Sequence, residues 1–179
     1  MSEPSFQYED ADVFTTGTVG RPGQRVFYLQ LRRGGASIAL KVEKQQVAAM
    51  AQYFEELMSD LAAPTELPHP DSLRLAEPVF SAWTVGPIGV AYEPAIDRVV
   101  VALEELVLTD ATEDDDMTIG EDETDDPDDG RATGRVMLTR AQVVAFVEHA
   151  RQIVAGGRPI CRFCGRPMDP DGHPCPRMN

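Results

Sequence analysis

The sequence predicts an α+β protein that contains two duplicated units, each a set of antiparallel strands closed by a helix. Two observations lead to this prediction, and a third concerns the end of the chain. Two segments carry apolar residues at the spacing of an amphipathic helix, and each follows runs rich in strand-forming residues. The two halves also resemble each other position by position. All three cysteines of the 179 residues lie among the last nineteen, which sets this tail apart from the body.

The first unit spans about residues 6–62. Residues 25–32 alternate between apolar and polar side chains, and a Gly-Gly pair separates them from a second strand-like run at 37–42, so we expect a hairpin. Apolar residues recur at helical spacing over 43–60, which predicts a helix with one buried face. Three prolines then end the helix and predict an irregular crossing to the second unit.

The second unit spans about residues 76–156 and repeats this plan. Thr139 is a suitable N-cap for a helix that extends to about Val154. The apolar residues that follow Gln46 have the same spacing as the apolar residues that follow Gln142. We interpret this likeness as an internal duplication; the alternative is a chance similarity between two amphipathic helices. The strands predicted in this unit are 79–85, 88–92, 98–108 and 134–138.

The connection predicted at residues 109–133 is an acidic loop. Residues 110–129 contain twelve acidic side chains and no Lys or Arg, whereas the rest of the chain has 18 acidic and 16 basic residues. Most of the net charge of −14 therefore belongs to this segment. Mutual repulsion and a shortage of apolar residues predict a disordered loop. A calcium-binding loop fits poorly, because apolar residues fall where oxygen ligands are needed; a third interpretation is a surface that attracts a basic partner.

Residues 157–179 form a tail with the spacing of a metal site. Cys161, Cys164, His173 and Cys175 follow the pattern C-x2-C-x8-H-x-C. Three thiolates and one imidazole complete a tetrahedral shell around zinc and leave no open position, as in structural zinc sites. We therefore predict structural zinc in a zinc-knuckle-like segment. The alternatives are a redox-active pair of the first two cysteines, a disulfide, and a catalytic zinc or iron site.

The body, residues 1–156, does not indicate a reaction. It contains no nucleophile elbow, phosphate-binding loop or dinucleotide fingerprint. Without an export signal or an apolar run that could span a membrane, we expect a cytoplasmic, non-enzymatic protein that acts through protein–protein contacts. Two alternatives stay open. One is a nucleic-acid-binding module in which Arg162, Phe163 and Arg166 contact phosphates and a base, and the other is an enzyme with a site between the two units.

Two stretches, 23–47 and 157–177, together carry a family resemblance. The first runs from Gly-Gln-Arg-Val-Phe-Tyr-Leu-Gln to Lys-Val-Glu-Lys-Gln-Gln-Val, and the second contains the whole Cys/His pattern. The chain resembles, over nearly its full length, an actinobacterial family of unknown function catalogued as domain of unknown function 3090. The resemblance implies no activity and no catalytic residues. It implies instead a protein partner, because members look like part of a trio of proteins found together, and it supports the Cys/His site.

Overall fold

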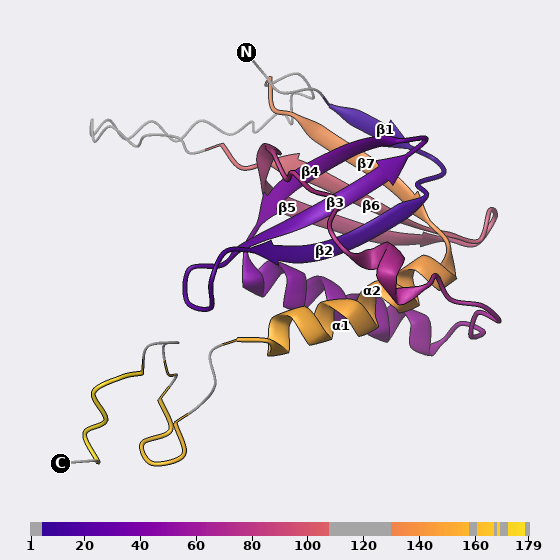
Figure 1. The fold of residues 1–179 in the computed structure, drawn as a ribbon. Coiled ribbons are helices and arrows are strands. Elements are labelled where there is room, and N and C mark those ends of the chain that lie inside the picture. The colour runs from indigo at the N-terminus through magenta and orange to yellow at the C-terminus, as the bar shows by residue number, and fades with distance from the viewer. Residues whose placement is uncertain (1–4, 108–129, 158–160, 167, 169–171, 178–179) are drawn as a thin grey trace, which may run out of the picture.

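The chain folds into a seven-stranded sheet with two α-helices against one face, as the computed structural model shows (Figure 1). The α+β class predicted from the sequence is confirmed. The structure describes residues 5–107, 130–157, 161–166, 168 and 172–177. The strands are β1 (Phe6–Tyr8), β2 (Val13–Val19), β3 (Val26–Arg33), β4 (Ala36–Val42), β5 (Ser81–Glu93), β6 (Arg98–Glu105) and β7 (Thr133–Leu138). The helices are α1 (Lys44–Ser59), α2 (Arg140–Ala155) and the short 3-10 helix η1 (Pro70–Leu73).

The sheet is mixed rather than purely antiparallel. Its strand order is β1-β7-β6-β5-β4-β3-β2. Neighbours within β2–β3–β4 and within β5–β6–β7 are antiparallel, but β4 pairs with β5, and β1 with β7, in parallel. A parallel pair needs a crossover, which α1 and the segment containing η1 supply between β4 and β5. After β1, three antiparallel strands followed by a helix occur twice along the chain, as β2–β3–β4–α1 and β5–β6–β7–α2.

The strands predicted at 79–85 and 88–92 form a single strand, β5. Gly86 and Pro87 lie in its middle, where the pairing with β6 shifts its register. Because proline has no backbone N–H to donate to a neighbouring strand, it is accommodated at such an irregularity. The signal that suggested a break in the sequence therefore marks a bulge within a continuous strand.

The sheet is strongly curved, because a short segment joins its two edge strands. β1 ends at Tyr8, and the amide of Asp12 already donates a 2.9 Å hydrogen bond to the Arg32 carbonyl of β3. Four residue steps span at most about 14 Å. The edges of a flat seven-stranded sheet lie about 29 Å apart, at six spacings of about 4.8 Å. The edges must therefore curl toward each other, and Figure 1 shows the chain turning from β1 directly into β2.

The two helices pack against each other over an aromatic core. The ring of Phe146 in α2 lies 5.0 Å from that of Phe14 in β2 and 5.5 Å from that of Phe54 in α1, between ring centres. All three rings are buried. No helix in the described part of the chain is long and apolar enough to cross a membrane. The buried helix residues are Val47, Met50, Ala51 and Phe54 in α1, and Val143, Ala145, Phe146, Val147 and Ala150 in α2.

The first turns of α1 and α2 are held in the same way. Gln46 and Gln142 are the third helical residues, and the Oε1 atom of each accepts a 2.9 Å hydrogen bond from the amide of the N-cap residue. The Nε2 atoms reach backbone carbonyls elsewhere in the fold. Gln46 donates to Gly86 at 2.8 Å, and Gln142 donates to Ala11 at 2.6 Å. One glutamine therefore ties each helix to the strand region beside it.

The acidic loop predicted at 109–133 ends earlier than expected. Ala132 is buried, its amide donates a 3.0 Å hydrogen bond to Glu105 Oε2, and Thr133 begins β7. Pairing of β7 with β6 holds these residues in a defined structure, because the ladder of paired residues continues to Glu104 and Thr133. Most of the predicted disorder, at residues 109–129, lies outside the described residues.

Candidate metal centre

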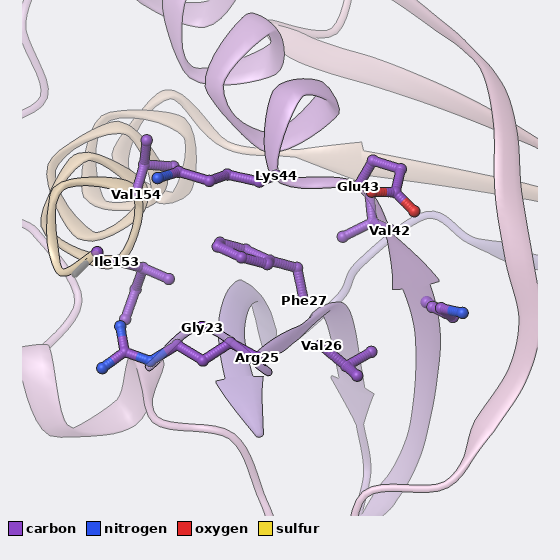
Figure 2. A pocket seen from close by; sticks show the side chains of 11 residues that line it. Gly23, Arg25, Val26, Phe27, Val42, Glu43, Lys44, Ile153 and Val154 are labelled. Atoms are coloured by element: carbon purple, nitrogen blue, oxygen red, sulfur yellow. The ribbon is translucent and has the colours of Figure 1, made fainter. Parts of the chain in front are cut away.

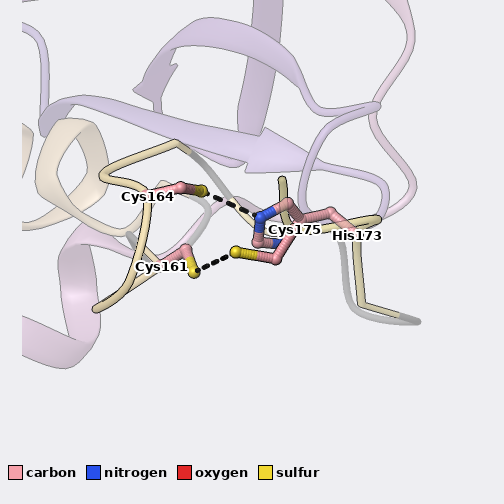
Figure 3. Close-up of side chains that lie close together, drawn as sticks. All are labelled: Cys161, Cys164, His173 and Cys175. Carbon is pink, nitrogen blue, oxygen red and sulfur yellow. Dashed lines mark hydrogen bonds between the residues drawn. The ribbon is translucent and has the colours of Figure 1, made fainter. Parts of the chain in front are cut away.

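The four predicted ligands meet at one point in the tail. The ligand atoms of Cys161, Cys164, His173 and Cys175 all lie within 4.8 Å of one another. The sulfurs of Cys161 and Cys175 are 3.9 Å apart, and Cys164 Sγ is 3.1 Å from His173 Nε2 (Figure 3). The two residues at the ends of the motif are buried, while the middle two are half-buried. These four side chains are therefore positioned to bind a metal ion.

A tight backbone turn brings the first two cysteines to the same side. The Gly165 amide donates to the Cys161 carbonyl at 2.8 Å, and the Cys161 amide donates to the Arg166 carbonyl at 2.8 Å. Gly165 has a φ of 71° and Gly172 a φ of 90°, a left-handed conformation that glycine adopts without steric cost. Glycine at these two positions lets the chain turn once after the first cysteine pair and again before His173.

Backbone amides and neighbouring thiols shift the pKa values of the two buried cysteines, Cys161 and Cys175, in opposite directions. Hydrogen bonds from the amides of Cys164 and Phe163 lower the pKa of the Cys161 thiol. The Arg177 amide also lowers the pKa of Cys175, but burial and the two nearby thiols raise it by more in total. Thiolates this close repel one another, so a bound cation would favour the deprotonated form of all three.

The donor set suits a metal ion better than a disulfide. All three cysteines are free thiols. The 3.9 Å between Cys161 and Cys175 sulfurs is much longer than the roughly 2.05 Å of a disulfide bond. Three sulfurs and one imidazole nitrogen form a four-coordinate set that leaves no position for a substrate. The arrangement can hold an ion and fix the tail around it.

The residues suggested for nucleic-acid contact lie on the same turn. The Arg162 guanidinium carbon is 4.9 Å from the centre of the Phe163 ring, within reach of a cation–π interaction. Phe163 is 45% exposed, and its carbonyl accepts a 3.2 Å hydrogen bond from Arg177. The carbonyl of Arg166 closes the cysteine turn. The structure thus brings Arg162 and Phe163 into contact, with the ring already partly covered by its neighbour.

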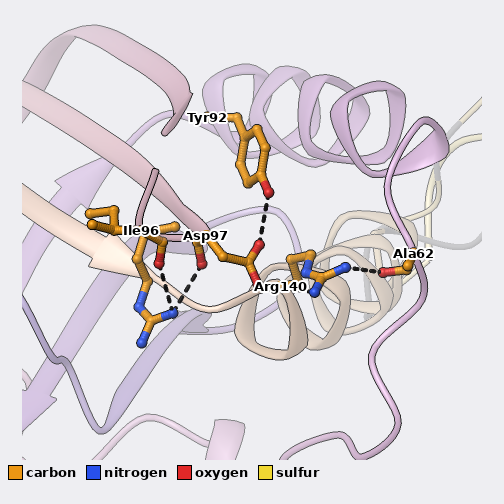
Figure 4. Close-up of polar contacts among 6 residues, drawn as sticks. Ala62, Tyr92, Ile96, Asp97 and Arg140 are labelled. Carbon is orange, nitrogen blue, oxygen red and sulfur yellow. Dashed lines mark hydrogen bonds and ion pairs between the residues drawn. The ribbon is translucent and has the colours of Figure 1, made fainter. Parts of the chain in front are cut away.

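A polar network that the sequence did not indicate joins three parts of the body (Figure 4). Asp97, in the β5–β6 turn, accepts hydrogen bonds from the Tyr92 hydroxyl at 2.8 Å and from Arg140 at 2.9 Å. Arg140, the first residue of α2, also donates to the carbonyl of Ala62 after α1, at 2.7 Å. The Tyr92 hydroxyl, and then Arg140, lower the pKa of the Asp97 carboxyl. The two contacts of Arg140 connect elements far apart in sequence, so no local pattern reveals them.

The fold and the Cys/His cluster together define a small α+β protein whose tail carries four side chains positioned to bind a metal ion. The comparison with protein families extends this description. The chain matches, over residues 6–175, the family described as a protein of unknown function, domain of unknown function 3090, and it belongs to that family. No curated protein and no solved structure matches it.

Proposed function

We propose that this is a cytoplasmic, non-enzymatic protein whose tail is ordered by structural zinc and which acts through contacts with another protein. The observation that carries the metal assignment is the convergence of three sulfurs and one imidazole within 4.8 Å. Around a tetrahedral zinc at about 2.3 Å from each sulfur, two sulfurs lie about 3.8 Å apart. The 3.9 Å between the Cys161 and Cys175 sulfurs agrees with this spacing.

Zinc has a clear physical role in a segment of this kind. Among the described residues 161–166, 168 and 172–177, only Cys161 and Cys175 are buried. So little apolar burial cannot order the tail, and metal-binding free energy would supply the folding energy instead. Free thiols that bind a metal are typical of a reducing compartment, which supports the cytoplasmic assignment.

We also propose that the body arose by internal duplication. The repeated order of three strands and a helix supports this, as do the matching roles of Gln46 and Gln142 at the helix starts. An enzyme with its site between two such units would need a cleft at their junction. Phe54 and Phe146, each 0% exposed, fill the centre of the interface between α1 and α2, so a site between the two units would lie at the edge of that interface.

Exposed apolar side chains support a role in protein contacts. Phe80, which precedes β5, is 78% exposed, and Leu106 and Val107, which follow β6, are 46% and 50% exposed. Since β5 and β6 are antiparallel, these residues lie at the same end of the strand pair. Large aromatic and aliphatic residues exposed in this way are common where proteins associate.

Elemental analysis tests the metal assignment directly. Protein purified without added metal should carry one zinc per chain, and chelation should release three reactive thiols. Cys164→Ser and His173→Asn should each lose most of the zinc and alter tail amide signals in NMR spectra, while the signals of the body persist. The matched control is His69→Asn, because His69 is an exposed loop residue whose Nδ1 accepts a hydrogen bond from the Asp71 amide of the same turn. Stoichiometric zinc and an unchanged tail in Cys164→Ser would refute the assignment.

A second candidate function is binding of single-stranded nucleic acid by the arginine-rich tail. The exposed Phe163 ring beside Arg162 favours it, because such pairs stack bases and contact phosphates. It requires binding of a fluorescent single-stranded RNA that weakens with salt and weakens further in the Arg162→Ala/Arg166→Ala variant. Binding that neither salt nor these substitutions change would rule this function out.

A further inference from the structure

A cavity of about 470 Å³ lies at one end of the body. None of the residues that line it belongs to the Cys/His cluster. The β2–β3 loop, the start of β3, the end of β4, the first turn of α1 and the last turn of α2 form its walls. Its volume falls within the range of small-molecule sites, roughly 300–1,000 Å³. The cavity depends on the tertiary fold, because its walls come from three separate stretches of the chain, within 23–27, 41–44 and 153–157.

One side of the cavity is apolar. Phe27 of β3 extends into the gap, opposite Ile153 and Val154 of α2 (Figure 2). These three side chains are only partly buried, and Val42 forms part of the same wall. An aromatic ring facing aliphatic side chains forms a slot suited to a flat apolar group.

Two cations flank this slot. Figure 2 shows the Lys44 side chain on one side of Phe27 and the Arg25 side chain on the other. Arg25 donates a hydrogen bond to the Gly156 carbonyl at the end of α2, which fixes its guanidinium while leaving other N–H groups free to donate. Within the described residues neither cation forms an ion pair. The Glu43 carboxylate, the nearest acid in the lining, points away from the gap (Figure 2).

Gly156 and Gly157 leave the space beside these cations open. A side chain at Gly156 would meet Arg25 Nη1 at 3.5 Å from its Cβ, and one at Gly157 would meet Lys44 Nζ at 3.5 Å. Neither glycine has a positive φ, so the backbone does not require glycine at these positions. Their lack of side chains instead keeps both charged groups accessible from the cavity.

We propose that this cavity binds a nucleoside phosphate. The base stacks on the Phe27 ring, and the phosphates lie nearer α2, between Arg25 and Lys44. Arginine suits this role, because its planar guanidinium donates paired hydrogen bonds to phosphate oxygens, and lysine adds a point charge. The apolar slot and the two cations together distinguish such a ligand from a bare anion or an uncharged ring.

Calorimetric titration with ADP tests this site, with adenosine and inorganic phosphate as separate probes. ADP should bind at least about tenfold more tightly than either part alone, because each part uses only half of the cavity. Lys44→Met and Arg25→Met should each weaken ADP binding by about tenfold or more, as expected for the loss of a charged hydrogen bond. Arg135→Met is the matched control, because Arg135 is exposed on β7, outside the cavity lining, and loses the same charge.

Gly157→Leu should abolish ADP binding by filling the cavity, without disturbing the backbone. Cys164→Ser should bind ADP as the wild type does, which separates this site from the proposed zinc function. Chemical shifts of the Lys44 and Gly157 amides during titration locate the bound ligand. The proposal is overturned if ADP fails to bind at about 1 mM, if adenosine binds as tightly as ADP, or if Lys44→Met and Arg135→Met weaken binding equally.

Discussion

Gly134→Ala should destabilise the protein, although alanine is ordinarily better than glycine in a strand. Gly134 lies in β7 opposite Phe6 of β1, and its φ is not positive. A Cβ atom there would lie within 3.0 Å of three ring atoms of Phe6. The ring stacks on Trp83, with 6.1 Å between ring centres, so moving it breaks a second contact. The substitution therefore introduces a steric conflict into a packed position rather than a favourable methyl group.

The expected cost follows from two opposing effects. Overpacking costs about 1–3 kcal/mol, and replacement of glycine by alanine in a strand recovers about 0.5–1 kcal/mol. Movement of the short β1 strand relieves part of the strain, so we expect a net loss of about 1–2 kcal/mol. For a chain of this length that loss lowers the Tm by roughly 2–8 °C.

Urea unfolding followed by fluorescence and circular dichroism measures this loss. Trp83 is the only tryptophan in the chain, and its emission should change as Phe6 moves. The deciding experiment is a double-mutant cycle with Phe6→Ala. Without the ring, Gly134→Ala should become neutral or stabilising by up to about 1 kcal/mol. An equal loss of stability with and without Phe6 would refute the steric explanation.

Two further predictions concern the core and the polar network. Phe146→Ala should lower the free energy of unfolding by about 3–5 kcal/mol in urea titrations, because its 0% exposed ring contacts Phe14 and Phe54. The exposed Phe80→Ala should change it by less than about 0.5 kcal/mol, and equal effects would contradict the assigned core. Asp97 has a lowered pKa in the folded state, so its contribution is present above the usual pKa of 3.8 and is lost as pH falls through the folded value. Asparagine tolerates the φ of 50° that Asp97 has in this turn. Asp97→Asn should therefore reduce the fall in Tm on acidification. An unchanged dependence of Tm on pH would argue against this network.

Local signals in the sequence predicted the elements that depend on local interactions. The helical spacing of apolar residues and the cap at Thr139 led to both helices, and alternation with a Gly-Gly turn led to the β3–β4 hairpin. The Cys/His spacing led to the four residues that converge in the tail. In each case the interacting residues lie within a few positions of one another, so their pattern is visible along the chain.

Errors in prediction occurred where distant contacts decide the structure. β1 has only three residues, too few for a periodic pattern, and its pairing with β7 joins residues more than 120 positions apart. β5 appeared broken at Pro87, because the bulge that accommodates the proline depends on the neighbouring strand. Residues 132 and 133, predicted to belong to a disordered loop, are likewise held in place by the pairing of β7 with β6.

The sequence by itself determined the α+β class, the two amphipathic helices and the four Cys and His residues that converge in the tail. These follow from side-chain periodicity and from the short reach of a metal-binding loop. Only the tertiary structure decided the curvature of the sheet, the parallel pairings and the cavity beside Arg25 and Lys44. These features arise because hydrogen bonding and burial bring together segments that have no relation along the chain, and a single sequence does not record which of them will meet.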